Sequence, residues 1–282
     1  MTTPLALTIA GSDCSAGAGL QADLKTFASH GLHGLTAVTC VVSETPLTVS
    51  QVHPVPPELL RDQIKLLLDS YPIGAIKTGM LYSKAHIEVV CELLAHSSIP
   101  LVVDPVMVAS TGDPLLVDDA LAEVSARLLP LATVITPNLP EAGYLLDREV
   151  RSAGDQESAA LELAHRYQAA CYLKGGHLKD CHQHRDLLAR DGSLTSFVGE
   201  HLELPQTHGT GCTLSAALAA GLALGHSLAE AAAKAHRFTH RALRDSSSWP
   251  VPHSSQRIWH LDQTSKKTFP TPSSRKTIKK EL

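Results

Sequence analysis

Hydrophobic positions along the chain alternate between short apolar runs and longer segments with helical spacing. The runs typical of buried strands are residues 5–10, 35–42, 75–78, 101–104, 133–136 and 171–174. Segments with the spacing of amphipathic or buried helices are residues 20–29, 57–69, 83–95, 118–128, 139–146, 155–168, 213–224 and 227–243. Strands that alternate with helices in this way predict an α/β fold, in which helices cover both faces of a mostly parallel central sheet.

The last third of the chain changes this pattern twice. Residues 185–190 and 194–202 form two extended segments separated by Asp191-Gly192, which predicts a hairpin. No linker and no internal repeat divides the chain before them, so we expect a single domain over residues 1–260. Residues 261–282 are expected to form a disordered basic tail, because Ser, Thr, Pro, Lys and Arg dominate there.

Composition narrows the class of protein. The chain has 282 residues, of which 44% are hydrophobic and 18% charged, as in ordinary globular proteins. Its net charge of -4 gives no indication of nucleic-acid binding. No signal peptide and no apolar run of the roughly 20 residues that span a bilayer is seen. The six cysteines are scattered, so we expect a reduced, cytoplasmic protein with no membrane partner.

The sixteen histidines are also dispersed along the chain. They lack the HExxH spacing of a zinc enzyme. Most of them are therefore expected to be surface or loop residues.

One stretch, Thr207-His208-Gly209-Thr210-Gly211-Cys212-Thr213, runs directly into the Ala/Leu-rich helical segment. A glycine-containing loop before a helix presents backbone N–H groups at the positive end of the helix dipole, which suits an anion. Cys212 would lie in the first turn, where we expect the dipole to lower the pKa of its thiol. The residues alone leave open a simpler interpretation, a flexible loop with a packed cysteine.

Polar or glycine-rich clusters follow nearly every predicted strand. They are residues 11–13, 44, 77–80, 104–107, 136–141 and 174–177. In open α/β sheets, ligands bind beyond the carboxyl ends of the strands. These clusters therefore predict one shared site.

The residue types in these clusters suit phosphoryl transfer. Asp104, Asn138 and Glu141 offer oxygen ligands for Mg²⁺, directly or through water, and Lys174 offers a cation beside a phosphate. Each also has a structural interpretation, as a helix cap, a first-turn carboxylate or an amphipathic lysine. Together with the anion-binding loop they supply a cation, a positive charge, an anion hole and a base. There is no GxxxxGK[ST] motif, which excludes a P-loop enzyme.

Several blocks of sequence resemble the hydroxymethylpyrimidine/phosphomethylpyrimidine kinases of thiamin biosynthesis, which belong to the ribokinase-like superfamily. The matching blocks are residues 7–13, 17–27, 77–80, 136–142, 174–177 and 208–217. The resemblance runs from about residue 5 to residue 245 and does not cover the tail. It implies a ribokinase-like fold, a homodimer, and ATP-dependent phosphorylation of 4-amino-5-hydroxymethyl-2-methylpyrimidine and its monophosphate.

The resemblance also implies roles for individual residues. Cys212 would activate the acceptor, where many ribokinase-like enzymes carry an aspartate, and the N–H groups of Gly209, Thr210 and Gly211 would form the anion hole. Asn138 and Glu141 would organise Mg²⁺ and the ATP phosphates, with Asp104 and Lys174 nearby. The pyrimidine pocket would be lined by Gly11, Asp23, Glu44, Met80, Val106 and Met107.

Position 44 departs from the family, which usually has glutamine there. A glutamine amide matches the amino donor and ring-nitrogen acceptor of the aminopyrimidine, whereas ionised Glu44 can only accept hydrogen bonds. Three outcomes are open: burial keeps the carboxyl neutral, the ring binds in its protonated form, or the preferred substrate is another heterocycle. We expect the aminopyrimidine still to bind, because the other blocks match.

Three other functions compete with this one. A pyridoxal kinase is the nearest, because some enzymes of that activity resemble this family and carry a cysteine in the same loop. A cysteine acyl-transfer enzyme would use Cys212 with His208, but the sequence shows no third, orienting residue. A non-catalytic pyrimidine-binding protein is disfavoured by the presence of Cys212, Asn138, Glu141 and Lys174.

Overall fold

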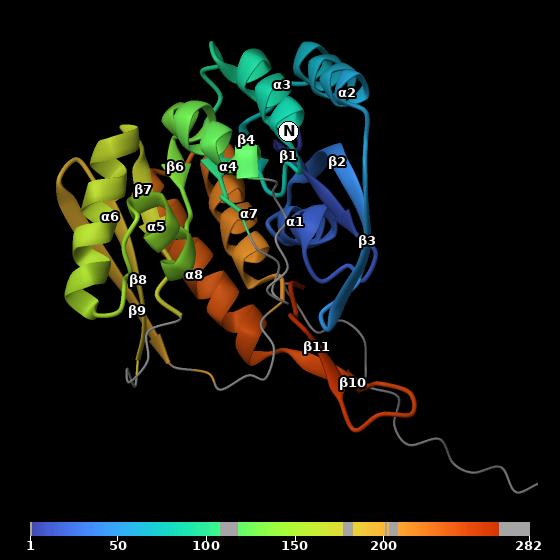
Figure 1. Ribbon diagram of the computed structural model, residues 1–282, viewed down its shortest axis with the longest axis vertical. Helices are drawn as coiled ribbons and strands as arrows, with labels where there is room; N and C mark the ends of the chain where they lie inside the picture. The colour runs from blue at the N-terminus through green and yellow to red at the C-terminus, as the bar shows by residue number, and fades with distance from the viewer. Residues whose placement is uncertain (1, 108–117, 177–182, 201, 203–207, 265–282) are drawn as a thin grey trace, which may run out of the picture.

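A nine-stranded sheet forms the centre of the computed structural model, which describes residues 2–107, 118–176, 183–200, 202 and 208–264 (Figure 1). Its order is β3-β2-β1-β4-β5-β6-β7-β8-β9. The strands are β1 (Leu5–Asp13), β2 (His33–Thr45), β3 (Thr48–Pro54), β4 (Ala75–Thr78), β5 (Leu101–Val103), β6 (Val134–Ile135), β7 (Ala170–Leu173), β8 (Gln183–Arg190) and β9 (Ser193–Glu200). Strands β2, β1, β4, β5, β6 and β7 pair in parallel, whereas β3, β8 and β9 pair antiparallel. The predicted mostly parallel sheet and the predicted hairpin are confirmed.

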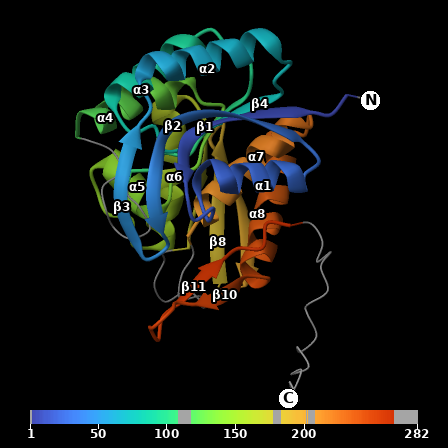
Figure 2. The ribbon, with the colours of Figure 1, turned by 90° about the vertical axis from the view of Figure 1, so that its right-hand side faces the viewer.

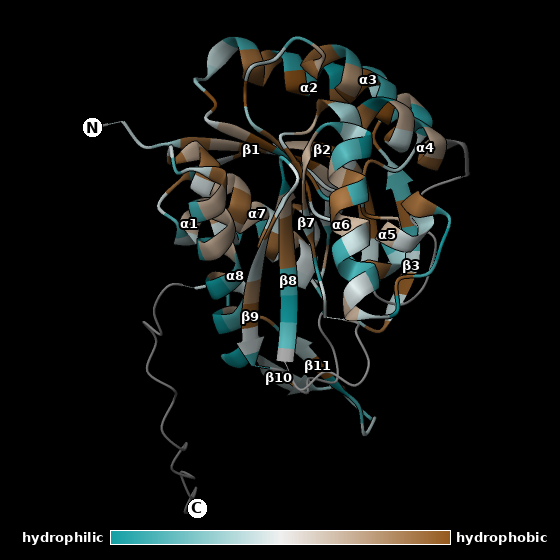
Figure 3. Cartoon of the chain, turned by 90° about the vertical axis from the view of Figure 1, so that its left-hand side faces the viewer, coloured by the Kyte–Doolittle hydropathy of each residue, from teal (hydrophilic) through white to brown (hydrophobic). Residues whose placement is uncertain are grey.

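Helices cover both faces of the sheet (Figures 1 and 2). One face carries α1 (Gly19–Ser29), α7 (Thr210–Ala223) and α8 (Leu228–Arg244), and the other carries α2 (Pro57–Ser70), α3 (Lys84–Leu94), α4 (Asp118–Glu123), α5 (Leu139–Leu146) and α6 (Ala153–Tyr167). A π-helical turn and a 3-10 turn extend α4 to Leu131. Each face has its own buried hydrophobic cluster, while the outer surface of α6 is polar (Figure 3). No described helix is long and apolar enough to cross a bilayer.

Helix α7 lies deep between the sheet and α8. Its residues from Thr213 to Gly221 are all buried, which confirms the buried helix predicted from the Ala/Leu-rich segment. A Cβ on Gly221 would lie 2.7 Å from the Cβ of Ala231, so the absence of a side chain lets α7 and α8 pack closely. The first residues of α7 lie near Gly17, Asp104 and Lys174, which follow the ends of β1, β5 and β7.

Strand β3 is an element that the hydrophobic pattern does not predict. It is an edge strand whose side chains are exposed or half-buried, so its sequence carries no apolar alternation. Its pairing with β2 also extends that strand to Thr45. Glu44 therefore lies within β2, beside a register shift after Ser43, and not in a loop after the strand.

The end of the described chain packs on the domain. Strands β10 (Ser247–Pro250) and β11 (Arg257–His260) form an antiparallel hairpin in which Trp249 stacks on His260. Beyond it, Leu261 is buried and the side-chain amide of Gln263 donates to Thr213 Oγ1 at 3.0 Å. Residues 261–263, which the sequence analysis assigns to the tail, thus contribute one buried apolar side chain and one buried hydrogen bond. Residues 265–282 of the expected tail lie outside the described part.

Candidate active site

The predicted anion-binding loop lies where α7 begins. Gly209 has a φ of 83°, and a Cβ there would lie 1.9 Å from the carbonyl oxygen of Gly17, so only glycine fits this position. A Cβ on Gly211 would lie 3.2 Å from Lys174 Nζ and 3.5 Å from a carboxylate oxygen of Asp104. The start of α7 thus meets two of the predicted phosphate-site residues. Thr207 and His177, also singled out in the sequence, fall outside the described residues.

Asp104, Glu141 and Lys174 come together from three elements. Lys174 Nζ lies 3.0 Å from Asp104 Oδ1 and 4.0 Å from Glu141 Oε2. Asp104 also accepts hydrogen bonds from the hydroxyls of Thr136 at 3.1 Å and Ser215 at 3.2 Å. The ends of β5 and β7 and the start of α5 therefore hold one ammonium group between two carboxylates.

The two carboxylates of this group differ in acidity. Burial raises the pKa of Glu141 to about 7; the charge of Asp104 adds to this effect and Lys174 opposes it. For Asp104, burial is also the largest influence, but Lys174 and Lys77 outweigh it and hold the pKa below its usual value. Near neutral pH, Asp104 is therefore ionised while Glu141 is only partly so.

Asn138 and Glu141 form a reciprocal cap at the start of α5. Asn138 Oδ1 accepts from the Glu141 N–H at 2.8 Å, and Glu141 Oε2 accepts from the Asn138 N–H at 2.7 Å. Asn138 is thus a helix cap and Glu141 a first-turn carboxylate, as their structural interpretation predicts. The cap also directs the Glu141 carboxylate toward Lys174. Asn138 acts here by positioning Glu141, because its amide oxygen is already engaged.

Cys212 lies half-buried in the first turn of α7, but its thiol is not acidified. Burial raises its pKa to about 11, although the ammonium of Lys77 and the backbone N–H of Gly19 act in the opposite direction. The carboxylates of Asp23 and Asp104 add to the increase. The expectation of a lowered pKa is wrong because desolvation and like charges, neither visible in the sequence, outweigh the helix dipole.

Asp23 and Lys77 form an ion pair beneath Cys212. Lys77 Nζ lies 2.8 Å and 3.0 Å from the two carboxylate oxygens of Asp23, which also accepts from the Thr8 hydroxyl at 2.6 Å. Both charged side chains have no exposed surface. Asp23, expected to line the substrate pocket, is thus engaged by Lys77 and Thr8. Lys77 belongs to the cluster predicted at residues 77–80, but its pairing with Asp23 was not predicted.

The remaining pocket residues lie close to these groups. A Cβ on Gly11 would lie 2.9 Å from Cys40 Sγ and 3.6 Å from Met80 Sδ, so Gly11 and Met80 are neighbours as the resemblance implies. Val106 is half-buried and Met107 is buried. The backbone N–H of Met107 donates to Glu141, which connects Met107 to the group formed by Asp104, Glu141 and Lys174.

Glu44 lies beside a pair of residues that the sequence analysis did not connect. His208 Nε2 is 3.1 Å from Asp13 Oδ2, and one side-chain atom from each of Asp13, Glu44 and His208 lies within 4.8 Å of the others. Burial and the charge of Asp13 raise the pKa of the Glu44 carboxyl, while His208 opposes the rise. A neutral acid has one donor and one acceptor, as an amide has.

The pair formed by Asp13 and His208 is also relevant to the alternative function of a cysteine acyl-transfer enzyme. Asp13 orients His208, so the third residue that the sequence lacked does exist in space. Its 195-residue separation from His208 explains why the sequence pattern does not reveal it. The high pKa of Cys212 nevertheless disfavours a thiolate nucleophile.

Comparisons with known proteins agree with the resemblance seen in the sequence. The family model of phosphomethylpyrimidine kinase matches residues 13–256. A hydroxymethylpyrimidine/phosphomethylpyrimidine kinase of Synechococcus elongatus is 42% identical over 219 residues, which are 77% of this chain and 83% of the relative. The Bacillus subtilis enzyme of the same name is 39% identical over 214 residues, covering 76% of this chain and 79% of the relative.

Solved structures of two activities resemble this fold. An ADP complex of Bacillus subtilis pyridoxal kinase has a TM-score of 0.83 and 35% identity, covering 92% of this chain and 97% of that one. A phosphomethylpyrimidine kinase from Clostridium difficile has a TM-score of 0.75 and 32% identity, covering 86% of this chain and 99% of that one. The predicted ribokinase-like fold is confirmed, and the neighbours leave two acceptor substrates to compare.

Proposed function

This chain belongs to the phosphomethylpyrimidine kinase family, and we propose that it transfers the γ-phosphoryl group of ATP to 4-amino-5-hydroxymethyl-2-methylpyrimidine and then to the resulting monophosphate. The product is a diphosphate for thiamin biosynthesis. The observation that carries the proposal is the meeting of Cys212, Lys174 and Asp104 at the start of α7. This arrangement supports the proposal, because an acceptor-activating group and a phosphate-binding cation are needed at one place.

The ATP phosphates are assigned to the side of the site that contains Lys174. The N-terminal turn of α7, including the N–H groups of Gly209, Thr210 and Gly211, offers the positive end of a 14-residue helix. Lys174 adds an ammonium group that Asp104 holds at 3.0 Å. These groups bind and orient the transferred phosphoryl group, which is most of what a kinase must do.

Mg²⁺ fits the oxygen donors of the same region. Asp104 and Glu141 both lie beside Lys174, and burial together with the charge of Asp104 raises the pKa of Glu141, so a bound cation would favour its ionised form. We assign Glu141 and Asp104 as its ligands, directly or through water, with Asn138 positioning Glu141 through the helix cap. The ion would neutralise charge on the phosphates.

The acceptor hydroxyl is assigned to the side of the site that contains Cys212. Its thiolate form would accept the hydroxyl proton as the oxygen–phosphorus bond forms, and Lys77 would stabilise that form. Asp23 holds Lys77 in place through two short contacts. Because the pKa of the Cys212 thiol is about 11, kcat is expected to rise with pH above neutrality.

Removing the sulfur tests this assignment. We expect Cys212→Ala to lower kcat on the order of 10²- to 10⁴-fold and to abolish its rise with pH, while the KM for ATP stays within about threefold. Cys91→Ala is the matched control, because Cys91 is a buried cysteine of α3, on the opposite face of the sheet. An unchanged kcat in Cys212→Ala would remove Cys212 from the reaction.

A second candidate is pyridoxal kinase activity. It is favoured by the close structural likeness to pyridoxal kinases and by Glu44, which replaces the usual glutamine of the family. Competition between pyridoxal and the aminopyrimidine for turnover separates the two functions. We propose the aminopyrimidine as the better substrate, because burial and the charge of Asp13 favour the neutral form of Glu44, which presents the same donor and acceptor as the missing amide.

We also propose a cytoplasmic homodimer whose folded domain ends near Thr264. The homodimer follows from the family resemblance alone, and the location from the scattered cysteines, which indicate a reducing compartment. Light scattering on the purified protein measures the oligomeric state directly.

A further inference from the structure

Three histidines gather at the edge of the sheet, away from the loop that contains Cys212. His184 comes from β8, and His236 and His240 come from α8. One side-chain nitrogen of each lies within 4.8 Å of the corresponding nitrogens of the other two. Because His236 and His240 are four residues apart, both face the same side of the helix. The expectation that most histidines are surface or loop residues does not hold for this cluster.

A buried carboxylate holds two of the rings in fixed orientations. Asp186 lies 2.8 Å from His184 Nε2 and 3.1 Å from His236 Nδ1. It also accepts from the Tyr172 hydroxyl and the Gly175 N–H, each at 2.9 Å. These bonds occupy one nitrogen of each ring. Within the described part of the chain the other two nitrogens, Nδ1 of His184 and Nε2 of His236, make no hydrogen bond and can take another ligand. Carboxylates commonly orient metal-binding histidines in this manner.

The third ring has a buried nitrogen with no hydrogen-bond partner. His240 Nε2 is inaccessible to solvent and makes no hydrogen bond among the described residues. The ring packs against Gly199, where an added Cβ would lie 2.4–2.8 Å from its atoms. A buried nitrogen that lacks a partner is costly unless something binds it.

We propose that His184, His236 and His240 bind a divalent transition-metal ion, for which zinc is the best chemical match. Imidazole nitrogens suit zinc, and three histidine ligands are an established zinc coordination set. Magnesium prefers oxygen ligands, so this site is distinct from the one assigned at Glu141. The ion would join α8 to the antiparallel edge of the sheet, and Asp186 would connect it to Gly175, next to Lys174. The proposal does not depend on the identity of the phosphoryl acceptor.

The test uses full-length protein without an affinity tag, loaded with Zn²⁺ and dialysed against metal-free buffer. The amount of zinc per chain is measured by mass spectrometry. The coordination of Co²⁺ bound in place of zinc is measured by visible absorption. We expect one retained zinc in the wild type and its loss in His240→Asn and His184→Asn. His240→Asn is the first choice, because the Nε2 atom that it removes makes no hydrogen bond. Added zinc should also raise the unfolding temperature of the wild type but not of His240→Asn.

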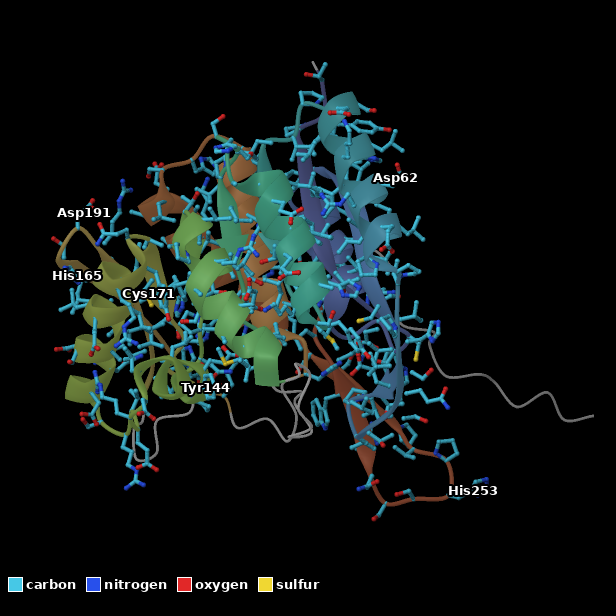
Figure 4. The ribbon with its side chains drawn as sticks, turned by 45° about the horizontal axis from the view of Figure 1, so that its top comes forward. Asp62, Tyr144, His165, Cys171, Asp191 and His253 are labelled. Atoms are coloured by element: carbon cyan, nitrogen blue, oxygen red, sulfur yellow. The ribbon has the colours of Figure 1, made fainter. Side chains whose placement is uncertain are left out.

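The matched control is His165→Asn, which removes an exposed histidine on α6 (Figure 4). It should retain one zinc and the zinc-dependent rise in unfolding temperature. The proposal is overturned if the wild type retains no zinc, or if His240→Asn retains as much as the wild type. The second result would direct attention to Asp13, Glu44 and His208, the other set with suitable spacing. X-ray absorption on the zinc-loaded wild type decides the matter even if a variant fails to fold: three imidazoles support the site, and sulfur or fewer imidazoles exclude it.

Discussion

Glu141 is a carboxyl group poised to titrate near neutral pH. Its pKa is raised from an ordinary value of 4.5 to about 7, so it is mostly protonated below pH 7 and mostly ionised above it. A cation ligand must be ionised, and we therefore expect the affinity for Mg²⁺-nucleotide to fall as pH decreases through about 7 and to level off above it. Calorimetric titrations with Mg²⁺-ADP between pH 5.5 and pH 8.5 measure this dependence.

Glu141→Gln is the variant that isolates the charge. Glutamine can keep the reciprocal cap with Asn138, so the start of α5 should remain folded. The variant should bind Mg²⁺-ADP more weakly than the wild type at pH 8 and with little pH dependence. If wild type and variant show the same pH profile, Glu141 does not act through its charge.

Glu44 leads to a prediction with the opposite pH dependence. Its raised pKa keeps the carboxyl neutral at lower pH, where it can donate to the ring nitrogen of the aminopyrimidine, and that donor is lost as pH rises through the pKa. The wild-type KM for the pyrimidine should therefore increase with pH, whereas Glu44→Gln should give a KM that changes little. Steady-state kinetics between pH 5.5 and pH 8.5 measure the KM of the wild type and of Glu44→Gln. Identical pH profiles would show that the carboxyl does not pair with the ring.

At the scale of single residues, the sequence indicated which side chains form the candidate site but not their pKa values or all of their partners. Lys174, Asp104 and Glu141 could be predicted as neighbours, because each follows a parallel strand and those ends converge. The pKa of Cys212 could not, because desolvation depends on the packing of the whole domain. The pairing of Asp13 with His208 joins residues 195 positions apart and has no local signal.

Helix α7 is the element that positions the reacting groups, and glycines with positive φ flank its two ends. Gly209 has a φ of 83° and no room for a Cβ, whereas Gly225 has a φ of 78° and nothing within 4 Å of an added Cβ. Gly225→Ala should cost about 1 kcal/mol of unfolding free energy and leave kcat unchanged. Gly209→Ala should cost more and lower kcat sharply, because the α7 start must move away from Gly17.

Urea unfolding and kcat are measured on Gly209→Ala and Gly225→Ala. The comparison separates the cost of a positive φ, which both variants have, from the steric clash with Gly17, which only Gly209→Ala has. Equal losses of stability and equal activities would show that the contact between Gly209 and Gly17 does not hold the site. The pair is well matched, since both substitutions add the same methyl group at a similar φ beside one helix.

Elements with a buried face or a recognisable turn could be predicted, whereas an edge strand with neither could not. Helix α5 was expected at residues 139–146 and spans Leu139–Leu146, because its cap and apolar face both lie in the sequence. Strand β3 was not expected, since backbone pairing with β2 defines it and its side chains carry no pattern. The two histidines of α8 with i,i+4 spacing were a local signal that could have indicated the histidine cluster.

At the scale of the whole molecule, residues 261–263 connect the chain beyond the β10–β11 hairpin to α7 and α8. Leu261 is 7% exposed, Gln263 donates to Thr213 at 3.0 Å, and the Asp262 N–H donates to the Ala242 carbonyl at 3.1 Å. A chain ending after Thr264 should keep its full unfolding free energy and activity. One ending after His260 should lose about 2–4 kcal/mol, from one buried leucine and the lost hydrogen bonds. Equal stability of the two chains in urea would return the domain boundary to residue 260.

The substrate of the complete enzyme is the central claim. The most direct measurement offers hydroxymethylpyrimidine, its monophosphate and pyridoxal separately to the purified wild type with ATP and Mg²⁺, and follows ADP formation and product mass. We predict turnover of both pyrimidines, with the monophosphate converted to the diphosphate, and weaker turnover of pyridoxal. Phosphorylation of pyridoxal without any pyrimidine diphosphate would contradict the proposed function, and Glu44 would then mark a changed specificity.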